Sequence, residues 1–285
     1  MQQKGIVMRK TKSIIPGFGL STGITISYIS FIILIPFVSI VLIAANMTWN
    51  SFWEAALNPR ILAGYRVSFS CSAIAAMINC VFGTILAWIL VRYDFPGRKF
   101  IDGLVELPFA IPTAVAGISL SSLYSDHGWI GSLFMLLGVK ISYTAIGITI
   151  AMIFVTLPFV VRTVEPVLQH MDPEFEEAAT TLGAGKSTVF FRVILPELIP
   201  SLLLGGGLAF ARALGEYGSV IFIAGNTPFE TEIVPLLIMS KLEQFNYAGA
   251  TAIAIVMLVI SFMLMFLINS LQIRQQKIIR GGETT

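Results

Sequence analysis

Long apolar stretches dominate the chain, and short polar connections separate them. Six stretches are long enough to cross a hydrocarbon core, which takes about 20 apolar residues. They cover residues 24–45, 67–91, 104–124, 143–161, 198–224 and 248–271. None alternates between apolar and polar positions as a barrel strand does, and in lipid only helices or closed barrels satisfy the backbone. The pattern predicts an all-α membrane protein, a six-helix transmembrane bundle.

The composition agrees with this pattern. The 285 residues are 56% hydrophobic and 12% charged, about half the charged share of roughly 25% found in soluble domains. The first apolar stretch is too long for the core of a signal peptide, so we interpret it as an uncleaved first span. A net charge of +2 does not indicate a nucleic-acid partner, and membrane lipid is the expected surrounding.

Lysine and arginine are distributed unevenly between the two sides of the predicted bundle. One side holds Lys4, Arg9, Lys10, Lys12, Arg92, Arg98, Lys99, Arg162, Lys186, Arg192, Arg274, Lys277 and Arg280. The other side holds only Arg60, Arg66, Lys140 and Lys241. The positive-inside rule then predicts a cytoplasmic N-terminal tail (residues 1–23), a transmembrane domain (24–271) and a cytoplasmic C-terminal tail (272–285).

Glycine and proline interrupt several predicted spans. They are Pro108, Pro112 and Gly117 in the third, Pro158 in the fourth and the glycines 205–207 in the fifth. One interpretation is close packing and kinking of helices; the other is that the third and fifth spans line a pathway and bend there. Residues 229–245 form a further candidate, a short re-entrant or interfacial element.

Residues 183–188, Gly-Ala-Gly-Lys-Ser-Thr, look like the end of a nucleotide-binding P-loop. The full pattern requires a glycine or alanine at position 180 and a buried strand before the loop. Position 180 is threonine, and the preceding run is acidic and begins with Pro173, which is typical of a helix N-terminus. The sequence therefore predicts no ATP site on this chain.

The connection that contains these residues is predicted to fold as a short helix. Asp172 suits the N-cap and Pro173 the first helical position, and Gly183 is placed to end the helix. Glutamates at 174, 176 and 177 favour the positive end of the helix dipole. A glycine turn, an apolar segment at 189–195 and Pro196 at the start of the next span follow. A short, firmly terminated helix is suited to docking in a cleft of a partner.

The same residues resemble a known signature. The matching positions are Glu177, Ala178, Ala179, Gly183, Val193, Leu195 and Pro196, with Val193 at a position that is usually isoleucine. Their spacing is similar to the EAA signature of ABC importer permeases. The resemblance implies a type I ABC importer permease fold, in which the loop at about 165–197 carries a coupling helix that sits in a groove of an ATPase subunit. ATP and Mg would then bind to that partner, and this chain would be a non-catalytic membrane subunit without cofactor or metal.

Other segments narrow the resemblance. Residues 16–19, 107–117 and 211–226 are similar to the T-type permease subunit of bacterial sulfate/thiosulfate importers, and the likeness extends from about Pro16 to Leu271. The core at 212–216 is shared with molybdate and tungstate permeases, so these anions are the alternative substrates. The resemblance implies import of sulfate or thiosulfate across the bacterial inner membrane. The implied partners are a second sulfate-type permease, two ATP-binding subunits and a periplasmic or surface sulfate-binding protein.

Arg212 and Glu216 are ionisable residues inside a predicted span and are therefore candidate pathway residues. Their i,i+4 spacing places them on one helix face, where they can pair. Two interpretations stay open: an internal ion pair that makes burial tolerable, or a positive group that attracts a divalent anion transiently. Glu106 is expected at the level of the membrane interface instead of in the pathway.

Two rival functions remain. An ion-coupled secondary anion transporter would need intramembrane carboxylates and paired broken helices. Glu216 alone is weak evidence for such a transporter. A membrane enzyme would need a converging set of catalytic groups or metal ligands. His127 and His170 lie in separate connections, and Cys71 and Cys80 fall in an apolar run where thiols usually pack, so neither pair indicates such a site.

Overall fold

The computed structural model describes residues 18–282, with side chains up to residue 274. The tail residues Lys4, Arg9, Lys10, Lys12, Pro16 and Gly17 lie outside the described residues, as do the side chains of Lys277 and Arg280. The described part is helical and contains no strand, which confirms the predicted all-α class.

The chain divides into two compact units, which meet between Thr48 and Trp49. The first contains α1 (Phe18–Ala45), an apolar helix in which no residue is buried. The helix begins upstream of residue 24, where the sequence pattern placed the start of the first span. An apolar helix without buried residues depends on its surroundings, lipid or another protein, to cover its side chains.

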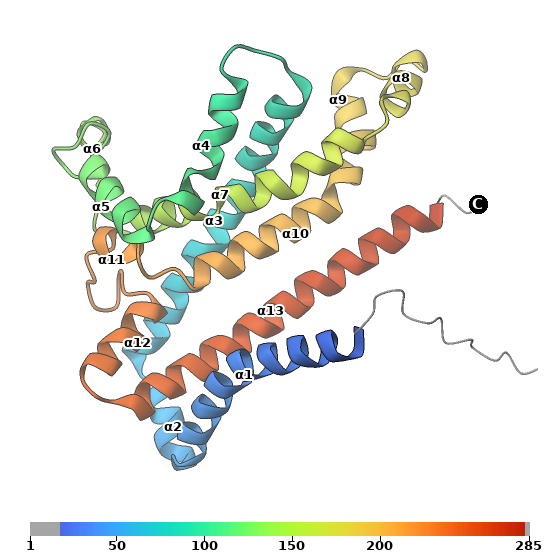
Figure 1. Ribbon diagram of the computed structural model, residues 1–285. Coiled ribbons are helices and arrows are strands. Elements are labelled where there is room, and N and C mark those ends of the chain that lie inside the picture. The colour runs from blue at the N-terminus through green and yellow to red at the C-terminus, as the bar shows by residue number, and fades with distance from the viewer. Residues whose placement is uncertain (1–17, 283–285) are drawn as a thin grey trace, which may run out of the picture. The chain divides into compact units, whose positions relative to one another are not determined.

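The second unit consists of helices joined by short connections (Figure 1). They are α2 (Trp49–Ala56), α3 (Pro59–Arg92), α4 (Arg98–Ala110), α5 (Thr113–Tyr124), α6 (Gly131–Met135), α7 (Ala145–His170), α8 (Pro173–Thr181), α9 (Lys186–Val189), the π-helical turn η1 (Phe190–Ile194), α10 (Leu195–Leu214), α11 (Val220–Ile223), α12 (Val234–Glu243) and α13 (Tyr247–Gly282). Helices α3 and α7 are longer than the predicted spans 67–91 and 143–161, since polar residues extend both of them.

Five described helices are long and apolar enough to cross a membrane: α1, α3, α7, the continuous helix Lys186–Leu214 and α13. The predicted third span is the bent pair α4 and α5, whose axes differ by 112°. The bend has a local cause, because a residue that precedes proline is driven out of the helical region, and Ile111 before Pro112 is extended, with ψ 132°. The six predicted spans are therefore five helices and one broken pair.

The fifth predicted span, 198–224, is wrong in its last part. Helix α10 ends at Leu214, and a non-helical segment, 215–219, separates it from α11. The glycines at 205–207 do not break the helix. Instead they allow close packing: a Cβ at Gly205 would lie 3.1 Å from Thr163, and one at Gly207 would lie 3.0 Å from Ile268. The packing interpretation is correct for these glycines.

Helices α3, α7 and α10 pack side by side and bury the main core (Figure 1). Val160 and Val161 of α7 and Leu198 and Ala209 of α10 are completely buried there. Figure 1 shows α8 and α9 at one end of α7 and α10, and α5, α6 and α11 at the other end. Within segment 229–245, the ten-residue α12 is too short to span a membrane and packs on α3 and α13, which agrees with the predicted short element.

Candidate functional site

Helix α8 lies in the connection between α7 and α10, where the sequence predicted it. The Asp172 side chain accepts a hydrogen bond from the Glu174 amide at 3.0 Å, and Pro173 is the first helical residue. After the helix, Gly183 has φ +85°, a conformation that glycine adopts without strain. A helix, not a strand, leads into residues 183–188, so this stretch lacks the structural context of a P-loop.

Two adjacent faces of α8 have different surroundings. Glu176 and Ala179 are half-buried and face the rest of the unit, where Ala179 packs against the main core. The outer face is apolar: Phe175 is 66% exposed and Leu182, just past the helix end, is 89% exposed. Phe175 and Leu182 were not predicted as site residues from the sequence. The available signal was their spacing of seven residues, which places two large apolar side chains on one face of an otherwise polar connection.

The residues of the EAA-like signature separate into two groups in the structure. Glu177 and Ala178 are exposed on α8. Three others, Val193, Leu195 and Pro196, are half-buried at the start of the helix that returns into the bundle. Gly183 forms the turn between the groups. A groove of about 690 Å³ between α8 and α9–η1 is lined by residues from both sides, among them Glu177 and Phe190.

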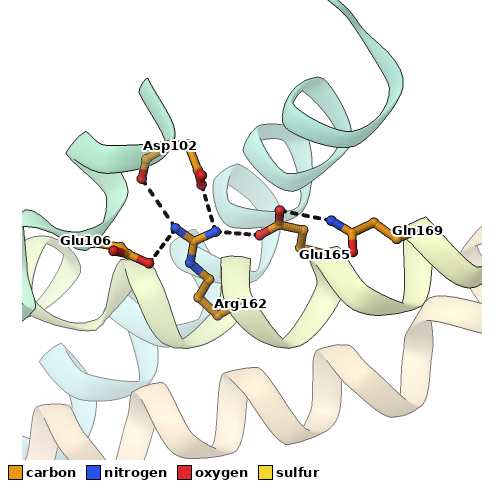
Figure 2. A network of polar contacts seen from close by, with 5 residues as sticks. All are labelled: Asp102, Glu106, Arg162, Glu165 and Gln169. Atoms are coloured by element: carbon orange, nitrogen blue, oxygen red, sulfur yellow. Dashed lines mark hydrogen bonds and ion pairs between the residues drawn. The ribbon is translucent and has the colours of Figure 1, made fainter. Parts of the chain in front are cut away.

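A polar network that the sequence analysis did not find joins α4 to α7 (Figure 2). Arg162 of α7 forms ion pairs with Asp102 at 2.7 Å and with Glu106 at 2.8 Å, both from α4. Its guanidinium also contacts Glu165 at 2.6 Å, and the Gln169 amide donates to Glu165 at 3.2 Å. Three carboxylates therefore share one arginine, which the sequence analysis had placed only as a basic residue of a connection.

We expect Arg162→Gln to loosen α4. The substitution leaves the carboxylates of Asp102, Glu106 and Glu165 close together without a cation, at a cost of about 1–3 kcal/mol for a partly exposed site. Thermal unfolding of the purified complex in detergent, with limited trypsin digestion at Arg98 and Lys99, measures the effect. Gln169→Ala is the matched control, because Gln169 contacts only the edge of the network. Equal melting temperatures for the two variants would contradict the assignment.

The predicted pair inside the fifth span is formed, although not on one helix face. Arg212 Nη1 and Glu216 Oε2 are 2.6 Å apart, but α10 ends at Leu214, so Glu216 lies in the turn that follows the helix. The Glu216 side chain is 1% exposed, whereas that of Arg212 is 36% exposed. The second oxygen of Glu216 accepts hydrogen bonds from the amide and the hydroxyl of Ser219, both at 2.9 Å. Glu216 is thus fully engaged within the chain, and Arg212 retains exposed donors.

The turn that holds Glu216 packs against the start of α5. A Cβ at Gly117 would overlap the backbone of Ser219, and a Cβ at Gly218 would overlap the Thr113 side chain. The contact requires glycine at both positions because the two backbones approach so closely. The break in the third span and the break in the fifth span therefore meet at one place in the bundle.

Comparison with known proteins identifies the class. Residues 79–277 match the family described as "Binding-protein-dependent transport system inner membrane component". A crystal structure of a bacterial alginate ABC transporter with a periplasmic protein contains a chain of the same fold, with a TM-score of 0.74 over 90% of this chain and 95% of that one, at 18% identity. The MetNI methionine ABC transporter contains another, with a TM-score of 0.54 over 82% of this chain and 99% of that one, also at 18% identity. The chain belongs to the binding-protein-dependent permease family and has the type I ABC importer permease fold.

Curated relatives are sulfate transport permeases. "Sulfate transport system permease protein CysT" of Escherichia coli (strain K12) is 47% identical over 264 residues, which cover 93% of this chain and 95% of the relative. The protein of the same description from Synechococcus elongatus is 50% identical over 245 residues, or 86% of this chain and 88% of the relative. The resemblance to sulfate-type permeases is confirmed.

Proposed function

We propose that this chain is the permease subunit of an ATP-driven importer of sulfate, and of thiosulfate, in the bacterial cytoplasmic membrane. Both termini and α8 lie on the cytoplasmic side in this proposal, in agreement with the distribution of lysine and arginine. The observation that carries the proposal is the outer face of α8, with Phe175 and Leu182 exposed on a capped helix of a type I permease fold. The proposed substrate, sulfate, is taken from the relatives that are described as sulfate transport permeases.

The chemistry of α8 fits docking into a partner. Exposed apolar side chains gain free energy when they leave water, at about 25 cal/mol per Å². Phe175, Ala178 and Leu182 would enter a groove of an ATP-binding subunit, with Glu177 at the edge of the contact. ATP and Mg would bind to that subunit, and this chain would undergo no chemistry of its own. Two such subunits would serve two permeases.

The apolar helices indicate further neighbours. Helix α1 has no buried residue. In α13, only 17% of the apolar 18-residue stretch that could cross the membrane is buried within this chain. Lipid and a second, related sulfate-type permease would cover these surfaces. The family description implies a binding protein. In our proposal it is a periplasmic or surface sulfate-binding protein that delivers the anion to the end of the bundle opposite α8.

Arg212 is our candidate for contact with the anion in the pathway. A charged side chain that is 36% exposed within a membrane span is costly in contact with lipid, so its exposed part should face water or another subunit. Glu216 would hold the guanidinium in place from the buried side. A guanidinium in a water-filled pathway attracts a divalent oxyanion without binding it permanently, as rapid transport requires.

Uptake of labelled sulfate tests which anion the importer transports. Cells that carry this chain with its genomic neighbours should accumulate labelled sulfate, and excess thiosulfate should suppress the uptake more than excess molybdate does. The same cells without this chain are the control. Suppression by molybdate or tungstate at far lower concentrations than thiosulfate would support the alternative, a molybdate/tungstate permease. Absence of sulfate uptake in the intact system would contradict the assignment.

A further inference from the structure

Helix α3 is the one member of the central α3–α7–α10 group that has no short backbone connection to α8. The chain enters α8 directly from α7 and leaves it through α9 and η1 into α10. Helix α3 reaches α8 through its last residue, Arg92, whose guanidinium forms an ion pair with Glu176. The same guanidinium lies 5.2 Å from the centre of the Trp88 ring and 3.9 Å from the sulfur of Met171.

The last turn of α3 also contacts the returning segment. The rings of Trp88 and Phe190 are 5.9 Å apart and nearly perpendicular, a favourable aromatic geometry. Trp88 therefore contacts both the guanidinium of Arg92 and the first residue of η1. One turn of α3 touches the entering side of the connection through Arg92 and the returning side through Trp88.

The Arg92–Glu176 pair is better shielded from water than a nearby surface pair. Both side chains are 24% exposed, whereas in the pair Arg98–Asp94 the aspartate is 96% exposed. Shielding from solvent strengthens an ion pair, while a fully solvated pair contributes little. Glu176 is turned inward to α3, and its neighbour Glu177 is exposed. The two adjacent glutamates therefore have different roles.

We propose that Arg92 and Glu176 transmit the movement of α8 to α3 and so couple ATP hydrolysis to sulfate transport. The inference rests on the proposed function, in which an ATP-binding subunit moves α8. Helices α7 and α10 follow α8 through the backbone, and α3 packs on both of them. The Arg92–Glu176 contact adds the direct link between α8 and the end of α3. Arg92 is in this sense a positioning residue: it contacts neither sulfate nor ATP.

The test measures the amount of sulfate transported for each ATP hydrolysed. The complete complex with its binding protein is reconstituted in lipid vesicles as wild type, Arg92→Gln, Glu176→Gln and the double variant. We expect each single substitution to lower the ratio of sulfate to ATP by about fivefold, the low end of known couplings between sites. The double variant should be no worse than the single ones, since all three lack the same contact.

Two matched variants separate coupling from folding. Arg92→Lys keeps the charge within reach of Glu176 and should retain most of the ratio, and Arg98→Gln removes the exposed pair and should leave the ratio unchanged. If Arg92→Gln does not assemble, the ratio of sulfate to ATP can still be compared between Arg92→Lys and Glu176→Gln. An unchanged ratio of sulfate to ATP in Glu176→Gln would overturn the inference. A double variant whose loss equals the combined losses of the two single variants would also overturn it, because Glu176 would then act on the ATPase independently of Arg92. A wild-type complex without ATP-dependent uptake would overturn the proposed function itself.

Discussion

Gly183→Val should abolish sulfate uptake while the protein still reaches the membrane. Gly183 has φ +85°, and nothing lies within 4 Å of an added Cβ, so the effect comes from the backbone and not from a clash. A β-branched residue is strongly disfavoured in this conformation, by more than the roughly 1–2 kcal/mol of an ordinary residue. The turn after α8 would change its path and move Leu182 away from the docking face. Uptake of labelled sulfate, with immunodetection in membranes, measures both properties.

Two glycine variants control this prediction. Gly183→Asn should retain much of the uptake, because asparagine tolerates positive φ better than other residues that have a side chain. Gly185 has φ −71° and open space around it, so Gly185→Ala should behave as wild type. Equal uptake by Gly183→Val and Gly185→Ala would show that the geometry of this turn is irrelevant to transport.

Glu216→Ala should both destabilise the protein and abolish uptake. The carboxylate is 1% exposed and is the shared partner of Arg212 and of two donors on Ser219. Its removal leaves a guanidinium and a buried amide without their acceptor, which costs about 3 kcal/mol for a pair of this kind. Thermal unfolding in detergent should show a lower melting temperature. Glu106→Gln is the control, because Glu106 is 60% exposed and shares its arginine with other carboxylates.

Arg212→Gln removes the positive group at the same site. Ser219 still donates to one oxygen of Glu216, but the carboxylate, which is 1% exposed, loses its cation, so we expect a loss of stability comparable to that in Glu216→Ala. Uptake by the protein that still assembles should fall strongly, because the positive group for the anion is gone. A variant that is stable, assembled and fully active would limit Arg212 to an internal ion pair.

The spans and the short helix could be predicted because their signals are local. Length and uniform apolarity define a membrane helix, and the caps Asp172 and Gly183 define α8 through the backbone groups that they satisfy or release. The proline that breaks the third span was visible as well. The size of the bend, 112°, also depends on how Gly117 of α5 and Gly218 of the turn after α10 let these two segments pack together, and no local pattern reports that contact.

The side-chain partners could not be predicted because they join residues far apart in sequence. Arg162 meets Asp102 and Glu106 only after α4 packs on α7, and Arg92 meets Glu176 only after α8 folds back to α3. The Arg212–Glu216 pair was predicted from its i,i+4 spacing, and the pair forms across a helix end instead of within a helix. Spacing alone does not show where a helix stops.

We propose that ATP, and not an ion gradient, drives sulfate through a path that this chain helps to form. The direct test is sulfate accumulation in vesicles that hold the purified complex, with the binding protein outside and ATP inside. We predict accumulation that requires ATP, survives collapse of proton and sodium gradients, and is lost in Gly183→Val. Accumulation driven by a proton or sodium gradient without ATP would rule out an ATP-driven importer and make this chain a secondary transporter.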